Sequence, residues 1–401
     1  MVSEIFLSEL CLPWSVIEEV KVVSTFSALL VMTLSLCASR TEPVWKAQPG
    51  PWGDLEVHTV YLEVPDTLLA AVSKPNAITR WVFEQTTESA VRELLVRQGV
   101  SVAIVERLMD PASRTLQDNI VSLYPSVAEI TSLSVTARSG LYRELAKSSA
   151  NEYQRDPVYV LGGDLEDWLD TSGLNEAQVK LFRRLVWKRG DTLVFSDIPA
   201  LLTVAKDDAE VRNTFRALTR VRSLLVELKL PLQGDRKAFL DYWTAGQGDA
   251  PQLSFLRAVT QRQASQTIDI THFFPAVIRQ RAYTFPELDQ GVKGRLPDCH
   301  WTSLNFFNST PKDEYLDMRL AATRLVQAYA TVEAPYKYGD VLCFLDGGEG
   351  LHTCVYIADD IVLTKNGDSV LAPWVLMQIK DVEAIYRRSA DTRIQGFRLK
   401  R

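Results

Sequence analysis

One cysteine and one histidine have the residue context for nucleophilic chemistry. Cys299 follows Pro297, which favours an extended backbone before it, and Asp298, which is a good helix N-cap. Cys299 is therefore expected in the first turn of a helix, where a thiolate is stabilised and can act as a nucleophile. His352 opens a predicted strand, from which it can take the thiol proton and later protonate a leaving amine. The alternative interpretation of Cys299 is a buried, inert thiol.

The other histidines are weaker candidates for the base. The chain has four histidines in all. His300 adjoins Cys299, but neighbouring helical residues point about 100° apart, so its ring is expected to diverge from the thiol. His58 and His272 fall in a different predicted domain, with no nucleophile close to them in sequence. This leaves His352 as the predicted base.

A third polar residue is expected to orient the imidazole of His352. Pairing residues 352–358 with 361–366 across a turn at Asp359 and Asp360 places Asn366 opposite or diagonal to His352. The amide oxygen of Asn366 can accept the imidazole N–H. A one-residue slip in register would bring Thr364 or Lys365 to this position, and Lys365 can only donate.

These motifs, taken together, resemble the NlpC-type cysteine peptidases. The family has a papain-like core and acts mostly on cell-wall peptides. Its order of motifs is a cysteine at a helix start, a Gly-Asp strand, a histidine strand and then a polar third residue. Here that order maps to Cys299, to the strand GDVLCF that begins at Gly339, to HTCVYIADD at His352, and to Asn366. The resemblance covers about residues 286–385.

The resemblance implies a hydrolase that cleaves an amide or peptide bond, with peptidoglycan-derived peptides as one substrate class. The chain departs from the family pattern after the cysteine, where His300, Trp301 and Thr302 replace small residues. It also lacks the Tyr and Trp-Gly-Gly segment that usually precedes the cysteine. Two alternatives remain open. One is an inactive papain-like binding or scaffold protein with Cys299 away from His352, and the other is an acyl or amide transferase that uses the same pair.

The composition limits the class of protein. Of 401 residues, 46% are hydrophobic and 23% are charged, which is typical of a soluble chain with two or three domains. It excludes a largely disordered chain, a collagen-like fibre and a multi-span membrane protein. Lys and Arg total 44 against 50 Asp and Glu, so no basic excess supports nucleic-acid binding. The chain has no CxxC pair and shows no nucleotide loop, so neither a metal nor an organic cofactor is expected.

The chain is predicted to have an α+β fold in two main regions. Residues 40–54 form a Pro- and Gly-rich linker, and residues 55–285 form a mostly helical domain that starts with a strand at 55–64. Capping and stop signals predict helices over 88–98 and from Asn175 and Asp207, the last extending as far as Leu225. This domain would bind substrate or restrict access to the site.

A polar loop at 286–297 marks the start of the C-terminal region, residues 286–401. Its pattern predicts a short helix from about 299, a longer helix over 314–330 and then antiparallel strands, an α+β arrangement. Strand-like runs lie at 339–345, 352–358, 361–366, 373–377 and 382–386. Cys343 and Cys354 fall on neighbouring runs, either as small core residues or as a disulfide if their Cα atoms are close enough.

The N-terminal 39 residues are typical of a signal peptide or leader. Residues 22–38 form an uncharged run of 17 between Lys21 and a small-residue cleavage site at Ala38 and Ser39. The run predicts export, to a periplasmic or extracellular space, with no transmembrane segment after cleavage. A short membrane anchor or a buried helix is the alternative. Lipoprotein anchoring at Cys37 is a further alternative, although Leu36 stands where a small residue usually precedes a lipid-bearing cysteine.

Overall fold

A computed structural model describes residues 45–70, 72–75, 77–287 and 295–400. The predicted leader, Cys37 and the first five residues of the linker lie outside the described residues. The chain has a mixed α/β fold whose sheets are antiparallel, which confirms the predicted fold class at this coarse level. Within the described ranges, every helix is too short or too polar to cross a membrane.

The largest sheet, here called the C-terminal sheet, has six antiparallel strands in the order β11-β16-β12-β13-β14-β15. Four of these strands fall on predicted runs: β12 (Val341–Asp346), β13 (Glu349–Ala358), β14 (Ile361–Lys365) and β15 (Trp374–Gln378). The strands β11 (Tyr329–Val332) and β16 (Arg393–Leu399) are not among the predicted runs. β16 comes last in the chain but lies between β11 and β12, so a local strand order does not reveal its position.

Helices cover both faces of the C-terminal sheet. α15 (Cys299–Leu304) and α16 (Met318–Ala328), with the 3₁₀ turn η4 (Asp313–Leu316) between them, pack on one face. α17 (Ile379–Tyr386) packs on the other face through Val382. The prediction of a strand over 382–386 is therefore wrong. Ile379, Val382 and Tyr386 recur at helical spacing, which suits one helical face against a sheet.

The two strand cysteines do not form a disulfide. The strand register places Cys354 opposite Leu342 and Cys343 opposite Thr353, so the two thiols point to opposite faces of the sheet. Both are buried and free, as small core residues.

The predicted helices of the N-terminal half form at the expected places. α3 (Glu88–Arg97) ends before Gly99, α9 (Glu176–Leu185) starts with a capping box between Asn175 and Gln178, and α11 (Asp208–Thr219) is capped by Asp207. The predicted extension to Leu225 is wrong, because Leu225 lies in strand β9 (Val221–Leu230). In β9 the buried side chains of Leu224, Val226, Leu228 and Leu230 alternate with less buried ones, which is the strand period.

The description of residues 55–285 as mostly helical is incomplete, because this region also contains small antiparallel sheets. They have the orders β3-β5-β4 and β6-β8-β7. Their strands are β3 (Trp81–Phe83), β4 (Arg114–Gln117), β5 (Ile120–Leu123), β6 (Val158–Val160), β7 (Trp187–Arg189) and β8 (Thr192–Phe195). The further helices are α2 (Asp66–Leu69), α4 (Val102–Leu108), η2 (Pro111–Ser113), α5 (Val127–Ser132), α6 (Val135–Leu145), α7 (Glu152–Arg155), α8 (Leu165–Asp170) and α10 (Ile198–Thr203). Residues 77–219, from β3 to α11, are called the N-terminal lobe below.

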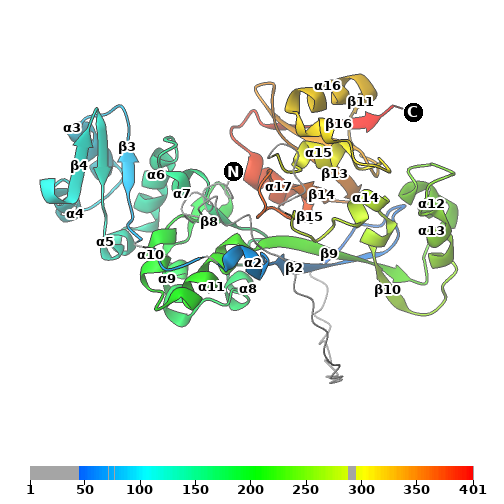
Figure 1. The fold of residues 1–401 in the computed structure, drawn as a ribbon, viewed down its shortest axis with the longest axis horizontal. Coiled ribbons are helices and arrows are strands. Elements are labelled where there is room, and N and C mark those ends of the chain that lie inside the picture. The colour runs from blue at the N-terminus through cyan, green and yellow to red at the C-terminus, as the bar shows by residue number, and fades with distance from the viewer. Residues whose placement is uncertain (1–44, 71, 76, 288–294, 401) are drawn as a thin grey trace, which may run out of the picture.

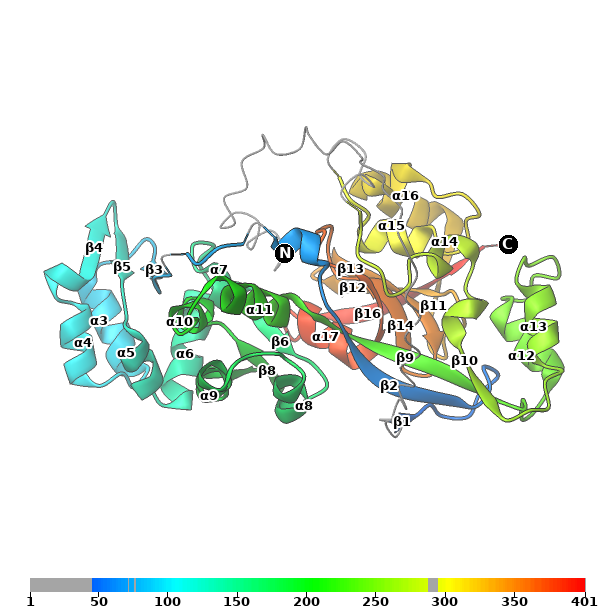
Figure 2. The same ribbon diagram turned by 60° about the horizontal axis from the view of Figure 1, so that its bottom comes forward.

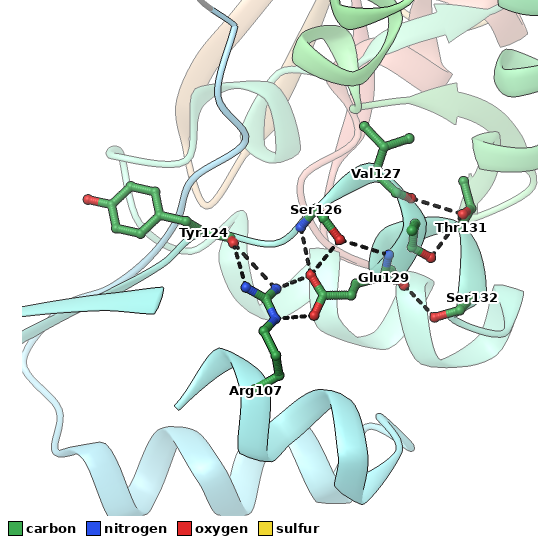
Figure 3. Close-up of polar contacts among 8 residues, drawn as sticks. Arg107, Tyr124, Ser126, Val127, Glu129, Thr131 and Ser132 are labelled. Atoms are coloured by element: carbon green, nitrogen blue, oxygen red, sulfur yellow. Dashed lines mark hydrogen bonds and ion pairs between the residues drawn. The ribbon is translucent and has the colours of Figure 1, made fainter. Parts of the chain in front are cut away.

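Local capping explains how the helices of the N-terminal lobe start and join. Figure 3 shows α5, where the Ser126 hydroxyl accepts a bond from the Glu129 backbone N–H and the Glu129 carboxylate accepts one from the Ser126 N–H. Arg107 of α4 pairs with the same carboxylate and donates to the Tyr124 carbonyl at 3.4 Å. This capping box therefore also ties α4 to α5.

A long ribbon joins the N-terminal lobe to the C-terminal sheet. It consists of β2 (Leu55–Leu62) and β9, extended at its sides by β1 (Trp45–Lys46) and β10 (Gln266–Asp269) in the order β1-β2-β9-β10. Figures 1 and 2 show the N-terminal lobe at one end of the ribbon and α12 (Arg236–Trp243) and α13 (Leu253–Val259) at the other.

The ribbon and the C-terminal sheet share one hydrophobic core. Leu224 and Val226 of β9 belong to the same buried cluster as Trp374 and Leu376 of β15. Ser223 also accepts a hydrogen bond from the Leu376 N–H at 3.2 Å. η3 (Ile270–Phe273) and α14 (Ala276–Arg279) connect the ribbon to α15. The boundary expected near residue 286 therefore runs through a shared core.

Candidate active site

Asp298 fixes the start of the helix that carries Cys299. Its carboxylate accepts a hydrogen bond from the Trp301 N–H at 2.7 Å, which confirms the predicted N-cap. Thr302 in turn accepts a bond from the Trp374 indole N–H at 2.9 Å, which holds α15 against β15. Cys299 is the first residue of this helix, and its side chain is 7% exposed. The Asp298 cap and the Thr302–Trp374 bond fix the position of α15 and therefore of the Cys299 sulfur.

His352 lies in β13 and is held rigidly on two sides. Its ring stacks on Tyr386 of α17, with ring centroids 3.9 Å apart and planes 11° apart. Its Nε2 lies 2.7 Å from the Thr364 hydroxyl oxygen on β14. The side chain is 1% exposed, and Nδ1 has no hydrogen-bond partner among the described residues. Because Thr364 occupies Nε2, Nδ1 is the nitrogen left to exchange a proton.

The residue that orients His352 is Thr364, and the prediction that Asn366 accepts the imidazole bond directly is wrong. The ladder between β13 and β14 pairs Val355 with Leu363, and β14 ends at Lys365. Asn366 lies beyond the end of the strand, so its amide turns toward neighbouring groups. Its Nδ2 contacts the Met377 sulfur at 3.2 Å, and its Oδ1 accepts from the Thr364 hydroxyl at 3.5 Å.

Asn366 is therefore linked to the imidazole only indirectly, through the Thr364 hydroxyl. With the His352 proton on Nε2, the ring donates to Thr364 and the Thr364 hydroxyl donates to Asn366. Tyr386 also donates to the Asn366 oxygen at 3.5 Å. In this tautomer Nδ1 of His352 carries a free lone pair.

His300 lies beside the thiol, contrary to the expected divergence of its ring. Its Nδ1 is 3.3 Å from the Cys299 sulfur and 3.6 Å from the Asp298 carboxylate. Side chains in a helix tilt toward its N-terminus, and no preceding turn crowds the first two positions of α15. Both side chains can therefore lean toward Asp298 and meet there.

The surroundings of Cys299 favour a thiolate. Burial alone raises its pKa, but the charges of His352 and His300, together with the hydrogen bond from His300, lower it further than burial raises it, to about 5. Burial raises the pKa of Cys343 to about 12 and also raises the pKa of Cys354. Among the described cysteines, Cys299 is therefore the one expected to be ionised at neutral pH.

Lys365 lies close enough to the site to act on its charges. Its side chain is fully buried. Burial lowers its pKa to about 8 against the raising effect of nearby anions, Cys299 among them. It donates to the Gly367 and Ser369 carbonyls at 2.8 and 3.1 Å. It thereby holds the loop after β14, whose Val370 packs into the core of the N-terminal lobe.

The helix behind His352 is fastened to the ribbon. Asp381 of α17 forms an ion pair with Arg222 of β9 at 2.7 Å, and both side chains are more than nine-tenths buried. Arg222 also donates to the Thr59 hydroxyl of β2 at 3.1 Å. The ribbon therefore fixes α17 and, through Tyr386, the position of the His352 ring.

One group of side chains among the residues that the structure describes has the donor spacing of a metal site. The donor atoms of Asp298, Cys299 and His300 lie within 4.8 Å of one another. One carboxylate oxygen of Asp298 already caps α15. His300 Nδ1 lies between the other Asp298 oxygen and the Cys299 sulfur, at 3.6 and 3.3 Å, so a proton on this nitrogen can be shared with either group.

The sequence identifies Cys299 and His352 as candidates but misses three of their neighbours in the site, His300, Thr364 and Tyr386. The angle between neighbouring helical residues argues against a contact between His300 and the thiol. Thr364 is considered only if the strand register slips by one residue. Tyr386 falls on a run that is predicted to be a strand. A hydroxyl residue two positions before Asn366 in the predicted strand 361–366 is the available signal for Thr364. No signal in the sequence identifies Tyr386, because its contact with His352 depends on how α17 packs.

Comparison with known proteins does not assign the chain to a family. No family model, no curated protein and no solved structure matches it.

Proposed function

We propose that this protein is an exported cysteine hydrolase of the NlpC type, with a papain-like catalytic domain. It would cleave an amide or peptide bond, and peptides derived from the cell wall are the substrate class that the resemblance implies. The observation that carries the proposal is the buried Cys299 thiol, with its lowered pKa, next to the positioned imidazole of His352. An inactive scaffold would not need this combination of a stabilised thiolate and an oriented base.

The chemistry follows from these positions. The Cys299 thiolate attacks the substrate carbonyl carbon, and the negative charge moves to the carbonyl oxygen. Backbone N–H groups at the start of α15, including that of Cys299, would stabilise this oxyanion. The C–N bond then breaks as the leaving nitrogen takes a proton from an imidazole, which leaves a thioester on Cys299.

Water completes the reaction. His352 Nδ1 removes a proton from a water molecule, whose oxygen attacks the thioester carbonyl. The C–S bond breaks, the carboxylic acid leaves and the thiolate is restored. Each cycle consumes one amide and one water and releases one amine and one acid, so no cofactor is required.

The test is the order in which the cysteines of the folded protein react. Cys299 should be alkylated by iodoacetamide at least tenfold faster than Cys343 or Cys354, and its advantage should persist to mildly acidic pH. The reason is that only the thiolate reacts and that the Cys299 pKa lies at about 5, whereas burial raises the pKa of the other two. Peptide mass spectrometry after short exposures from pH 4.5 to 9 gives each rate.

The same experiment in denaturant is the control, because all three thiols should then react at similar rates near their ordinary pKa. Equal rates at Cys299 and Cys343 in the folded protein would remove the evidence for a nucleophile.

A further inference from the structure

The Cys299 thiol has two imidazoles near it, and they are not equivalent. The Cys299 sulfur is hydrogen-bonded to His300 Nδ1 at 3.3 Å. Nδ1 of His352 makes no hydrogen bond with regular geometry to any described residue, although its charge acts on the thiol. In the structure, His300 is therefore the imidazole in direct contact with the atom that reacts.

The groups behind the two imidazoles differ in charge. The carboxylate of Asp298 lies 3.6 Å from His300 Nδ1 and stabilises a positive charge on that ring. The far nitrogen of His352 meets the neutral hydroxyl of Thr364, and Tyr386 covers its face. A proton that leaves the thiol can thus be held on His300, where the Asp298 carboxylate stabilises the resulting cation.

We propose that His300 is a second catalytic residue that divides the acid–base work with His352. It holds the thiol proton as an imidazolium paired with the Cys299 thiolate, and it gives this proton to the leaving amine. His352 serves as the base that activates water. The proposal rests on the proposed hydrolase function and assigns its first proton transfer.

The protons gained and lost by the site are equal in number over one catalytic cycle. His300 loses its proton to the amine when the C–N bond breaks, and His352 gains a proton from water when the thioester is attacked. After the acid has left, the extra proton passes from His352 to the thiolate and from there to His300. The Cys299 sulfur is hydrogen-bonded to His300 and within the electrostatic influence of His352, so this return needs no additional group.

The pKa of His300 agrees with this assignment. Burial lowers it, but the Cys299 thiolate and the Asp298 carboxylate raise it more, so that the net shift is upward. Other titratable groups also act on the thiol from the elements packed around it. These are Cys343 on β12, His352 and Cys354 on β13, Lys365 on β14 and Tyr386 on α17.

The test compares the pH dependence of Cys299 alkylation in three full-length variants. H300Q should raise the pH at which half of Cys299 reacts by about 1–3 units, because an adjacent cation is lost. H352Q should also raise it, because the charge of His352 acts on the same thiol. H272Q, which changes an exposed histidine outside the site, should leave it unchanged. The probe is iodoacetamide, and peptide mass spectrometry reports the rate at Cys299.

A second readout separates a catalytic role from a structural one. p-Nitrophenolate leaves an ester without being protonated, so H300Q at pH 9 should still be acylated by p-nitrophenyl acetate within about tenfold of the wild-type rate. H352Q should be acylated but should lose the acetyl group from Cys299 slowly. A misfolded variant would fail in both steps, and its thermal unfolding would show it directly.

The outcomes distinguish this inference from the proposed function. If H300Q keeps the wild-type midpoint while H352Q raises it, His300 has no role in holding the proton and the hydrolase proposal still stands. If Cys299 of the wild type reacts no faster than Cys343 at any pH, the nucleophile itself is wrong and the role of His300 falls with it.

Discussion

Replacing Cys299 with alanine is expected to lower hydrolysis by roughly four to six orders of magnitude, the loss that follows removal of a catalytic nucleophile. The sulfur forms the covalent bond to the substrate, so no neighbouring group can replace it. The binding surface and the oxyanion donors would remain, and they account for any residual rate. Cleavage is measured by liquid chromatography and mass spectrometry on a muramidase digest of peptidoglycan.

Cys343→Ala is the matched control, because Cys343 is also buried and free but has a pKa raised by burial. It should retain activity within a few fold. Wild-type turnover in the Cys299→Ala protein would show that another residue carries the reaction.

Trp374→Ala is expected to have the largest effect on stability, about 3–5 kcal/mol in the free energy of unfolding. Trp374 is fully buried in the core shared by the ribbon, α15 and the C-terminal sheet. The truncation would leave a cavity and would leave the Thr302 hydroxyl without its indole donor. The midpoint of urea denaturation, followed by circular dichroism, measures the change.

Two further variants calibrate that measurement. Trp374→Phe should cost less than Trp374→Ala, because it retains most of the ring volume and loses only the N–H. Val326→Ala, on a side chain of α16 that is 72% exposed, should stay within about 0.5 kcal/mol of the wild type. A loss below about 1 kcal/mol for Trp374→Ala would mean that α15 does not depend on this contact.

Local sequence signals are sufficient to predict the elements that carry Cys299 and His352. Asp298 caps α15 because a short acidic side chain after Pro297 can accept the free N–H groups of a first turn. β13 and β14 are predictable because apolar, β-branched runs flank the turn at Asp359, a residue with positive φ. These signals lie within about ten residues of the feature that they predict.

Long-range packing decides the features that the sequence does not reveal. β16 lies between β11 and β12, and β9 pairs with β2 across more than 150 residues of sequence. α17 is a helix because one of its faces packs on the sheet and its Asp381 pairs with Arg222. Hydrophobic periodicity over a short run cannot separate such a helix from a strand.

The differences between the predicted and the observed contacts of the site also arise from features that local sequence patterns do not describe. An idealised ladder favours Asn366, but β14 ends one residue earlier and the hydroxyl of Thr364 reaches the imidazole first. The angle between adjacent residues in a helix interior argues against His300, but it does not govern the first turn of α15. In both cases the positions of side chains at the end of an element determine the outcome.

The most direct test of the central claim is the covalent intermediate on Cys299. The full-length protein is mixed with p-nitrophenyl acetate, quenched in acid within milliseconds to seconds and digested for peptide mass spectrometry. We expect a burst of about one equivalent of p-nitrophenolate and an acetyl group on Cys299 that disappears with time, and neither in Cys299→Ala. Acetylation that is absent from Cys299, or a burst that persists in Cys299→Ala, would contradict the assignment of Cys299 as the nucleophile.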